Sequence, residues 1–341
     1  MLIAADIGGT KTDLAIFSKE AGPHAPLAQA KVHSADYPSL PAIVKEFLAK
    51  TKKTVDQACF AIAGPVIAGR VKTTNLPWVV EDASIARELN LDLRSVRLIN
   101  DLEAIARAVP VLRPSDVKTI NSGEPVPKGT IGVIAPGTGL GESFLTWDGT
   151  RYLAHSSEGG HADFAPTDER QIHLLEYMLK KFDHVSFEHV CSGIGIPHIY
   201  GYLRDVERIP EQPEVAARIA TAGDPSVAII HHALSSADPS KLCAETIDTF
   251  VSILAAEASN LAVKFLATGG VYLAGGVAVH TLPALQKPAF LQAFKRKGRF
   301  AELMARIPIH VVVSQAALAG AAACGLETRQ TRKSVSSRKD N

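Results

Sequence analysis

The feature that most constrains the fold of this 341-residue chain is a strand–glycine turn–strand pattern that occurs twice. Residues 2–17 are predicted to form a hairpin around a Gly-Gly-Thr turn at 8–10, and residues 131–147 repeat the design around a Gly-Thr-Gly turn at 137–139. Glycine has no Cβ, so such turns let backbone N–H groups approach an anion closely. Two hairpins of one design, one in each half of the chain, predict two related domains that grip one polyphosphate.

A third glycine turn follows the apolar strand at residues 271–274, where Gly275 and Gly276 stand together. Any one of these turns is equally typical of an ordinary tight turn. The first turn is not a Walker A loop, because the four-residue spacer before Gly-Lys is missing. No Gly-x-Gly-x-x-Gly follows the first strand either, so a dinucleotide-binding fold is not supported.

The remaining pattern is mixed α/β, with strands alternating with amphipathic helices. A stretch rich in proline, serine and glycine at residues 110–128 indicates a boundary. We therefore expect a small α/β domain at 1–110, completed by an alanine-rich helix at 314–326 that Gly325 stops, and a large α/β domain at 111–313. The polar residues 327–341 are expected to be a disordered tail.

Charge and cysteine content exclude several classes of protein. The formal net charge of +1 gives no field that would favour nucleic acid or an acidic membrane. No apolar run is long enough to cross a bilayer, and a strand beginning at Leu2 leaves no room for a signal peptide. The cysteines are far apart, which argues against zinc and disulfides and favours a reducing cytoplasm: Cys59, Cys191, Cys243 and Cys324.

Five short motifs, taken in order, resemble those of bacterial-type glucokinases. They are Asp6-Ile7-Gly8-Gly9-Thr10, Ile99-Asn100-Asp101, Pro136-Gly137-Thr138-Gly139-Leu140-Gly141, Glu158-Gly159-Gly160-His161 and Ala274-Gly275-Gly276. That family belongs to the actin/hexokinase/Hsp70 group of ATP-binding folds. The resemblance implies two ribonuclease-H-like domains flanking a central cleft, with ATP, Mg²⁺ and glucose as ligands and a cytoplasmic homodimer.

Two positions depart from the family pattern. Lys11 and Thr12 follow the first turn and look more like the neighbouring ROK sugar kinases, but the cysteine-rich zinc motif of that family is absent. Glu142 follows the second turn, where glucokinases usually have an apolar residue. A carboxylate there would repel a phosphate unless it points away or helps to hold magnesium.

Asp101 is the candidate base, because it follows an apolar strand and can take the proton of an attacking hydroxyl. From spacing alone, Asp101 is more typical of the N-cap of a helix at 102–109, a role that Asn100 can share. The resemblance assigns catalysis to Asp101 and sugar hydroxyls to Asn100.

The resemblance implies a sugar clamp of Glu158, His161 and Glu188, in which the carboxylates accept strong hydrogen bonds from hydroxyls. The alternatives are a solvated loop charge for Glu158, a buried structural histidine for His161 and an exposed helix face for Glu188. Asn75 is expected to touch a sugar hydroxyl.

The nucleotide-binding residues are carried over from the resemblance. Asp6 is expected to hold magnesium through water, and Thr10 to hydrogen-bond the transferred phosphoryl group. The full set for phosphate and adenosine is Asp6, Gly8, Gly9, Thr10, Gly137, Thr138, Gly139, Gly275 and Gly276.

Together these residues predict ATP-dependent phosphorylation of glucose to glucose 6-phosphate. The alternatives are a kinase for another hexose or an N-acetylhexosamine, a non-catalytic sugar sensor, and an actin-like ATPase. The absence of a helix-turn-helix before Leu2 argues against a DNA-binding sensor.

Overall fold

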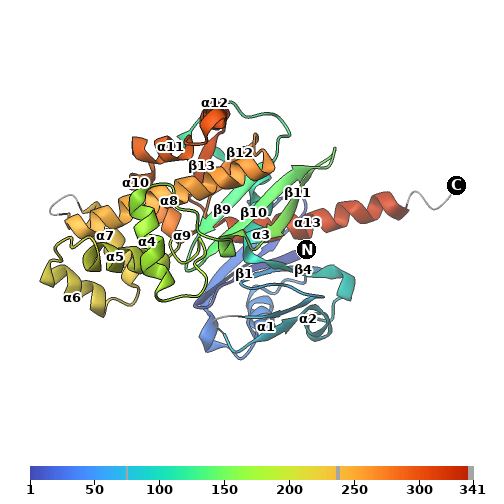
Figure 1. Cartoon of the computed structure of the whole chain (residues 1–341). Coiled ribbons are helices and arrows are strands. Elements are labelled where there is room, and N and C mark those ends of the chain that lie inside the picture. The colour runs from blue at the N-terminus through green and yellow to red at the C-terminus, as the bar shows by residue number, and fades with distance from the viewer. Residues whose placement is uncertain (74–75, 236–238, 337–341) are drawn as a thin grey trace. The chain divides into compact units, whose positions relative to one another are not determined.

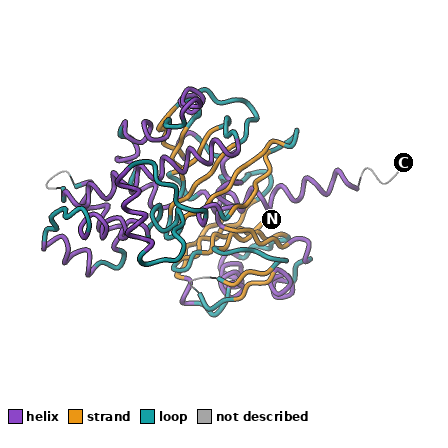
Figure 2. Tube along the Cα trace, viewed as in Figure 1, coloured by secondary structure: helices purple, strands orange, loops and turns teal. Residues whose placement is uncertain are grey.

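The computed structural model describes residues 1–73, 76–235 and 239–336 (Figure 1). The chain divides into two compact units. Unit 1 contains residues 1–113 together with the segment from 314 onward, and unit 2 contains residues 114–313. Each unit has a central sheet covered by helices, as the strands and helices in Figure 2 show.

The sheet of unit 1 has five strands in the order β3-β2-β1-β4-β7. The first three strands form antiparallel hairpins, whereas β1, β4 and β7 run parallel. Their bounds are β1 (Leu2–Ile7), β2 (Lys11–Phe17), β3 (Ala28–His33), β4 (Gln57–Ile62) and β7 (Val96–Asn100). A short hairpin of β5 (Arg70–Lys72) and β6 (Val79–Glu81) stands apart from this sheet.

Successive side chains of β1 point to opposite faces of this sheet, and both faces are buried. Ile3 and Ala5 pack in the cluster that contains α1 (Leu40–Thr51) and α2 (Asp82–Leu89). Leu2 and Ala4 face the opposite way, toward α3 (Asp101–Ala108) and α13 (Ala316–Ser336). Successive strand residues point to opposite faces, so an almost wholly apolar strand predicts this three-layer arrangement.

The prediction that Gly325 ends the last helix is wrong, because α13 continues to Ser336. The expected disordered tail at 327–341 is wrong over the same stretch, and 337–341 lie outside the described residues. A Cβ on Gly325 would stand 2.5 Å from Leu2 Cδ1 and 3.2 Å from Cys59 Cβ. Gly325 therefore serves close packing of α13 on the sheet rather than helix termination.

The sheet of unit 2 repeats the topology of unit 1. Its order is β11-β10-β9-β12-β13-β8, in which the first five strands correspond to the five of unit 1 and β8 is added antiparallel at the edge. The bounds are β8 (Val117–Asn121), β9 (Ile131–Pro136), β10 (Leu140–Trp147), β11 (Tyr152–Ser157), β12 (Gly270–Leu273) and β13 (Ile309–Val312). The predicted α/β fold class, with two units of one topology, is confirmed.

Unit 2 is built around α8 (Lys241–Phe265), whose apolar side chains belong to a single large core. The helix ends at Leu266, which adopts φ 48°. The other helices are α4 (Glu169–Leu179), α5 (Gly195–Asp205), α6 (Pro213–Thr221), α7 (Pro225–Leu234), α9 (Gly275–His280), α10 (Leu282–Leu285), α11 (Pro288–Phe294) and α12 (Ala301–Arg306).

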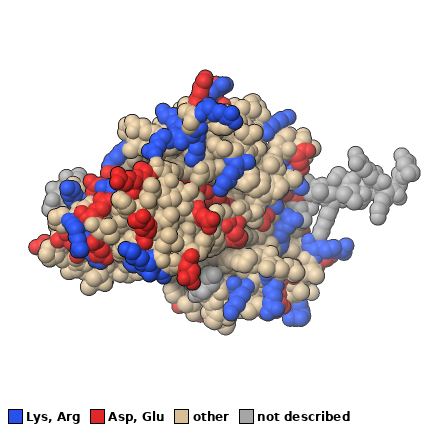
Figure 3. Space-filling model, viewed as in Figure 1, with Lys and Arg blue, Asp and Glu red and all other residues tan. Residues whose placement is uncertain are grey.

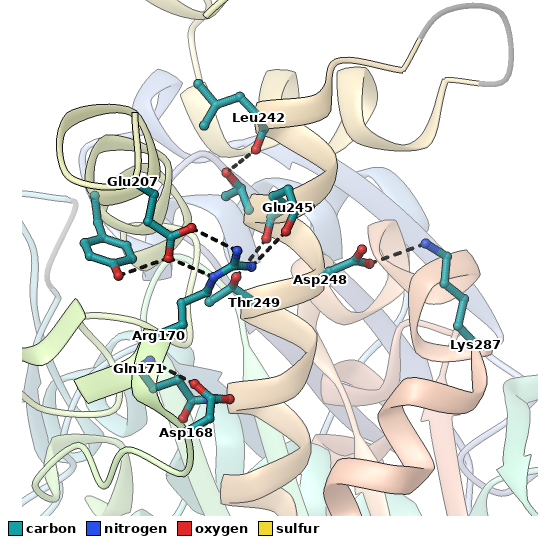
Figure 4. Close-up of polar contacts among 11 residues, drawn as sticks. Asp168, Arg170, Gln171, Glu207, Leu242, Glu245, Asp248, Thr249 and Lys287 are labelled. Atoms are coloured by element: carbon teal, nitrogen blue, oxygen red, sulfur yellow. Dashed lines mark hydrogen bonds and ion pairs between the residues drawn. The ribbon is translucent and has the colours of Figure 1, made fainter. Parts of the chain in front are cut away.

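An arginine ties three of these helical segments together (Figure 4). Arg170 at the start of α4 donates to both carboxylate oxygens of Glu207, at 2.8 and 2.9 Å, and to Glu245 of α8 at 2.8 Å. A bidentate arginine–carboxylate pair fixes geometry as well as charge. This network holds α4 and the segment after α5 against α8.

The surface carries both signs of charge, and lysine, arginine, aspartate and glutamate are interspersed on the face drawn in Figure 3. No helix in the described part of the chain is both long and apolar enough to cross a bilayer.

Candidate functional site

In unit 1, polar groups gather where three parallel strands end. Asp6 lies at the end of β1, opposite Ala61 of β4, and Asp101 immediately follows β7. Burial, followed by the nearby carboxylates of Asp101 and Asp13, raises the pKa of Asp6 to about 7. Asp13 forms an ion pair with Lys31 at 3.0 Å, so this salt bridge offsets part of the local negative charge.

Asn100, rather than Asp101, is the N-cap of α3, so the N-cap alternative for Asp101 is wrong. The Asn100 Oδ1 atom accepts from the N–H of Leu102 at 2.9 Å and of Glu103 at 3.3 Å, and its Nδ2 donates to Gly64 O at 3.0 Å. Asp101 is the first residue of α3, and its Oδ1 accepts from Leu102 N at 2.9 Å. An amide group has two N–H donors, so Asn100 has one N–H left for a ligand.

The carbonyl groups of the first glycine turn are held from behind by Ser34. Its N–H donates to Thr10 O at 2.9 Å, and its hydroxyl donates to Gly8 O at 3.0 Å. The buried hydroxyl of Thr12 pairs with Ser34 Oγ at 3.0 Å, which gives Thr12 a structural role, while Lys11 is exposed. Tying the carbonyl oxygens in this way removes acceptors that would repel an anion.

The second glycine turn is held in the same manner. Gly193 N–H donates to Gly137 O at 2.7 Å and Ile194 N–H donates to Thr138 O at 3.2 Å. A Cβ on Gly193 would stand 2.9 Å from Gly137 O, so this approach requires a glycine. Both turns therefore have their carbonyl groups bonded by a later segment of their own unit.

A cavity of about 590 Å³ opens beside the second turn, within unit 2. Gly276 lines it, and the preceding Gly275 adopts φ 84°. A Cβ on Gly275 would stand 2.6 Å from Pro136 O, so the start of α9 packs directly on the end of β9. The volume is within the range of small-molecule sites. The lining residues are Gly137, Thr138, Gly193, Ile194, Pro197, Gly223, Asp224, Pro225, Ser226, Val227, Gly276, Val277 and His280.

The segment from Glu158 to His161 rests on β10, next to the second turn. A Cβ on Gly160 would stand 2.0 Å from Leu140 O, and Gly160 O accepts from Glu188 N at 2.9 Å. The Glu188 Oε2 atom in turn accepts from Leu140 N at 2.9 Å. The His161 Nδ1 atom lies 4.0 Å from Glu188 Oε1, with exposed side-chain fractions of 61% and 23%. The buried-histidine alternative and the exposed-helix alternative are therefore both wrong.

Glu142 points away from the phosphate turn. Its side chain is buried against Glu257 of α8 and against Gly159, where a Cβ would stand 2.1 Å from Glu142 Oε2. The expected repulsion of a phosphate by this carboxylate is therefore avoided by its orientation.

The structure brings the predicted residues together within each unit. In unit 1 these are Asp6, Gly8, Gly9, Thr10, Asn100 and Asp101, and in unit 2 they are Gly137, Thr138, Gly139, Glu158, His161, Glu188, Gly275 and Gly276. Asn75 lies outside the described residues. Sequence reasoning missed Gly193 and Asp224, although Ser-Gly and Gly-Asp-Pro are turn signals that could have drawn attention to them.

Comparison with known proteins agrees with this geometry. The model of the family described as Glucokinase matches residues 3–328. A glucokinase of Nostoc punctiforme is 41% identical over 340 residues, which cover 95% of this chain and 98% of that protein. Among solved structures, a glucokinase from an Antarctic psychrotroph has a TM-score of 0.79 at 28% identity and covers 95% of this chain and 98% of its own.

A more distant structure shares the fold. The ROK-family glucokinase of Streptomyces griseus, solved in complex with glucose and AMPPNP, has a TM-score of 0.64 at 19% identity and covers 94% of this chain and 97% of its own. The family match and the coverage of these relatives lead to one conclusion. The chain belongs to the glucokinase family.

Proposed function

We propose that this protein transfers the γ-phosphoryl group of ATP to the 6-hydroxyl of glucose. The observation that carries the proposal is the 590 Å³ cavity of unit 2, which one glycine turn and the start of α9 border together. Its apolar walls of Ile194, Pro197 and Val277 suit a nucleobase, and the adjoining turn at 137–139 suits phosphate. The bound nucleotide is proposed to be ATP because a related fold was solved with AMPPNP and glucose.

Asp101 is proposed to act as the base. The 6-hydroxyl oxygen attacks the γ-phosphorus, the bond from that phosphorus to the bridging oxygen breaks, ADP leaves, and the hydroxyl proton passes to Asp101. A carboxylate at the first position of a helix, held by Leu102 N–H, is positioned on a rigid element. Positioning and charge stabilisation account for most catalysis of phosphoryl transfer.

The sugar is proposed to be held by Glu158, His161 and Glu188, with Asn75 and the remaining N–H of Asn100 as further donors. Glu188 has one oxygen engaged by Leu140 N–H, so its other oxygen is directed toward His161. Carboxylates and an imidazole match the donors and acceptors of a ring of hydroxyls.

Gly8, Gly9, Thr10, Gly137, Thr138 and Gly139 are proposed to form the two turns that bind the phosphates, and Gly275 and Gly276 to admit adenosine. In the second turn, the N–H groups of Gly137 and Leu140 donate to Gly139 O and Glu188, which leaves those of Thr138 and Gly139 for phosphate.

Magnesium fits the acidic edge of unit 1. Burial, followed by repulsion from the carboxylates of Asp101 and Asp13, raises the pKa of Asp6. A divalent cation would relieve that repulsion. In the described part of the chain, no three acidic, histidine or cysteine side chains could hold a metal directly. This agrees with an ion that keeps waters and phosphate oxygens as ligands and is held by Asp6 through water. When bound, the ion neutralises charge on the transferring phosphoryl group.

The compartment and assembly are also proposals. The four cysteines are buried as thiols, which is compatible with a reducing cytoplasm. A homodimer rests on the family resemblance, and sedimentation equilibrium would test it.

A sugar panel assayed with several phosphoryl donors tests the function. We expect ATP consumption with glucose to exceed that with fructose, mannose and N-acetylglucosamine. Preference for another sugar would support the ROK-like alternative. ATP hydrolysis that no sugar changes would indicate an actin-like ATPase, and sugar binding without turnover would indicate a sensor.

A further inference from the structure

Two buried glutamates lie beneath the segment from Glu158 to His161, and the proposed reaction uses neither. Glu142 on β10 is 3% exposed, and Glu257 on α8 is fully buried. Among the described residues, the Oε1 atoms of both are buried without a hydrogen-bond donor. Asn260 donates to Glu257 Oε2 at 2.8 Å, and Lys264 Nζ stands 3.7 Å from Glu257 Oε1.

One proton shared by the pair satisfies both orphaned oxygens. Two neighbouring carboxylates cannot both ionise cheaply in a low-dielectric interior. Burial, followed by the charge of Glu257, raises the pKa of Glu142 to about 8. Burial also raises the pKa of Glu257, but the Asn260 hydrogen bond and the charge of Lys264 oppose that rise. Glu142 is therefore the partner that carries the proton and donates it to Glu257.

Glu142 also occupies the space beneath the first glycine of the segment. A Cβ on Gly159 would stand 2.1 Å from Glu142 Oε2 and 2.8 Å from its Cδ. Glu142 pairs in register with Ser157, whose hydroxyl accepts from Gly159 N at 3.0 Å. The Glu142 carboxyl group thus packs beneath the backbone between Ser157 and Gly160 and supports it.

We propose that Glu142 is a positioning residue for sugar binding, whose neutral carboxyl group, hydrogen-bonded to Glu257, holds Glu158 and His161 in the arrangement that binds glucose. This inference rests on the proposed function, because it assumes that those two side chains contact the sugar. It gives a reason for a glutamate at a position where a small or apolar residue would suffice for a phosphate turn.

The charges around the pair define what loss of the proton would do. Glu257 and Lys264 face Glu142 from α8. Lys297 lies near Glu257 and donates to Asn260 at 2.7 Å. Burial, followed by the charges of the two glutamates, raises the pKa of the nearby Cys191 thiol. Lys264 is half exposed, so it cannot neutralise a second buried charge completely. Repulsion from Glu257 would then drive the Glu142 carboxylate toward Gly159.

Two variants separate position from charge. Glu142→Ala removes the support beneath Gly159. It should raise the KM for glucose by about tenfold or more while kcat changes by less than about threefold, because only the charged hydrogen bonds that bind the sugar are weakened. Glu142→Gln keeps the shape and the donor to Glu257, so its KM at pH 7 should stay within about twofold of wild type. Asp248→Asn, which removes an exposed carboxylate from α8, the helix that carries Glu257, is the matched control.

The pH profile is the second readout. In the wild-type protein the KM for glucose should rise severalfold between pH 7 and pH 9, whereas Glu142→Gln should show a flat KM over that range. The KM for ATP should not follow this pattern in either protein. Calorimetric titration with glucose alone repeats the comparison without turnover.

The outcomes are distinguishable. If the wild-type protein phosphorylates no hexose, both the proposed function and this inference are wrong. If glucose is phosphorylated but Glu142→Ala keeps the wild-type KM, or if Glu142→Gln shows the wild-type pH profile, only the inference is overturned. Should Glu142→Ala fail to fold, the pH profile of Glu142→Gln decides alone.

Discussion

The carboxylate of Glu188 accepts a hydrogen bond of 2.9 Å from the backbone N–H of Leu140. Leu140 begins β10 directly after the second glycine turn, and Glu188 is bonded through its own N–H to Gly160. A single residue therefore joins the proposed phosphate turn, through its side chain, to the proposed sugar segment, through its backbone, in unit 2.

Replacing Glu188 should separate these two roles. Glu188→Gln can still accept from Leu140 but loses its charge, so we expect the KM for glucose to rise about 10- to 100-fold and the KM for ATP to change little. Glu188→Ala should raise both. Initial-rate kinetics measure the two constants, with Glu176→Gln on the exposed face of α4 as control. An equal change of both constants in Glu188→Gln would contradict this assignment.

Asp101→Asn should lower kcat by about 10²- to 10⁴-fold, because the positioned base is lost. Asparagine still accepts from Leu102 N–H, so calorimetry should find glucose binding nearly unchanged. Glu103→Gln removes a neighbouring carboxylate that pairs with Arg107 and serves as the control. Normal turnover in Asp101→Asn would remove this residue from the mechanism.

Asn100→Ala should lower the free energy of unfolding by about 1–2 kcal/mol, because α3 loses its N-cap. The variant also leaves Gly64 O without its donor. Asn100→Asp keeps the oxygen that accepts from Leu102 and Glu103, so most of the lost stability should return. Urea denaturation measures both variants, and equal losses would show that capping is not the source.

Gly320→Ala tests the contact between α13 and α3 inside unit 1. A Cβ at position 320 would stand 1.7 Å from Ala104 O, so the two helices would have to separate. We expect a net loss of about 1–2 kcal/mol, since an overpacking cost of about 2–3 kcal/mol outweighs the gain of about 1 kcal/mol in helix propensity. Gly325→Ala, which meets mainly the movable tip of Leu2, should lose less. Thermal and urea unfolding measure both losses, and a larger loss in Gly325→Ala than in Gly320→Ala would contradict this prediction.

The buried Glu142 makes stability depend on pH. Its pKa is raised from 4.5 to about 8, so between these values the folded protein keeps a proton that the unfolded chain releases. The free energy of unfolding therefore falls as pH rises through this window, by on the order of 1 kcal/mol per pH unit. Glu142→Gln should match wild type near pH 5 and exceed it near pH 8 in urea denaturation. Parallel curves would show that Glu142 ionises normally.

Much of the fold was accessible from the sequence because glycine turns and apolar strands leave strong local signals. Both hairpins lie where the pattern predicts them. The strand β8 was missed in the supposed linker at 110–128, because an edge strand with several exposed residues has no alternation of apolar side chains. The edge strand β3 was also missed, although Ala28, Ala30 and Val32 alternate with polar residues along it.

The site was only partly predictable. Asn and Asp both cap helices, so sequence could not decide between Asn100 and Asp101 until the hydrogen bonds were known. The burial of Glu142 depends on Glu257, which is more than a hundred residues away in the chain. Gly193 and Asp224 enter the cavity from two separate loops, and no local pattern joins them to the second turn.

The discontinuous make-up of unit 1 sets an order for its biosynthesis. Leu2 and Ala4 are translated long before Ala317, Leu318 and Ala321 of α13, yet their side chains pack against that helix. Until that helix leaves the ribosome, only α3 covers this side of the sheet. Residues 114–313 carry their own core without interruption, so we expect the middle of this protein to mature before its beginning.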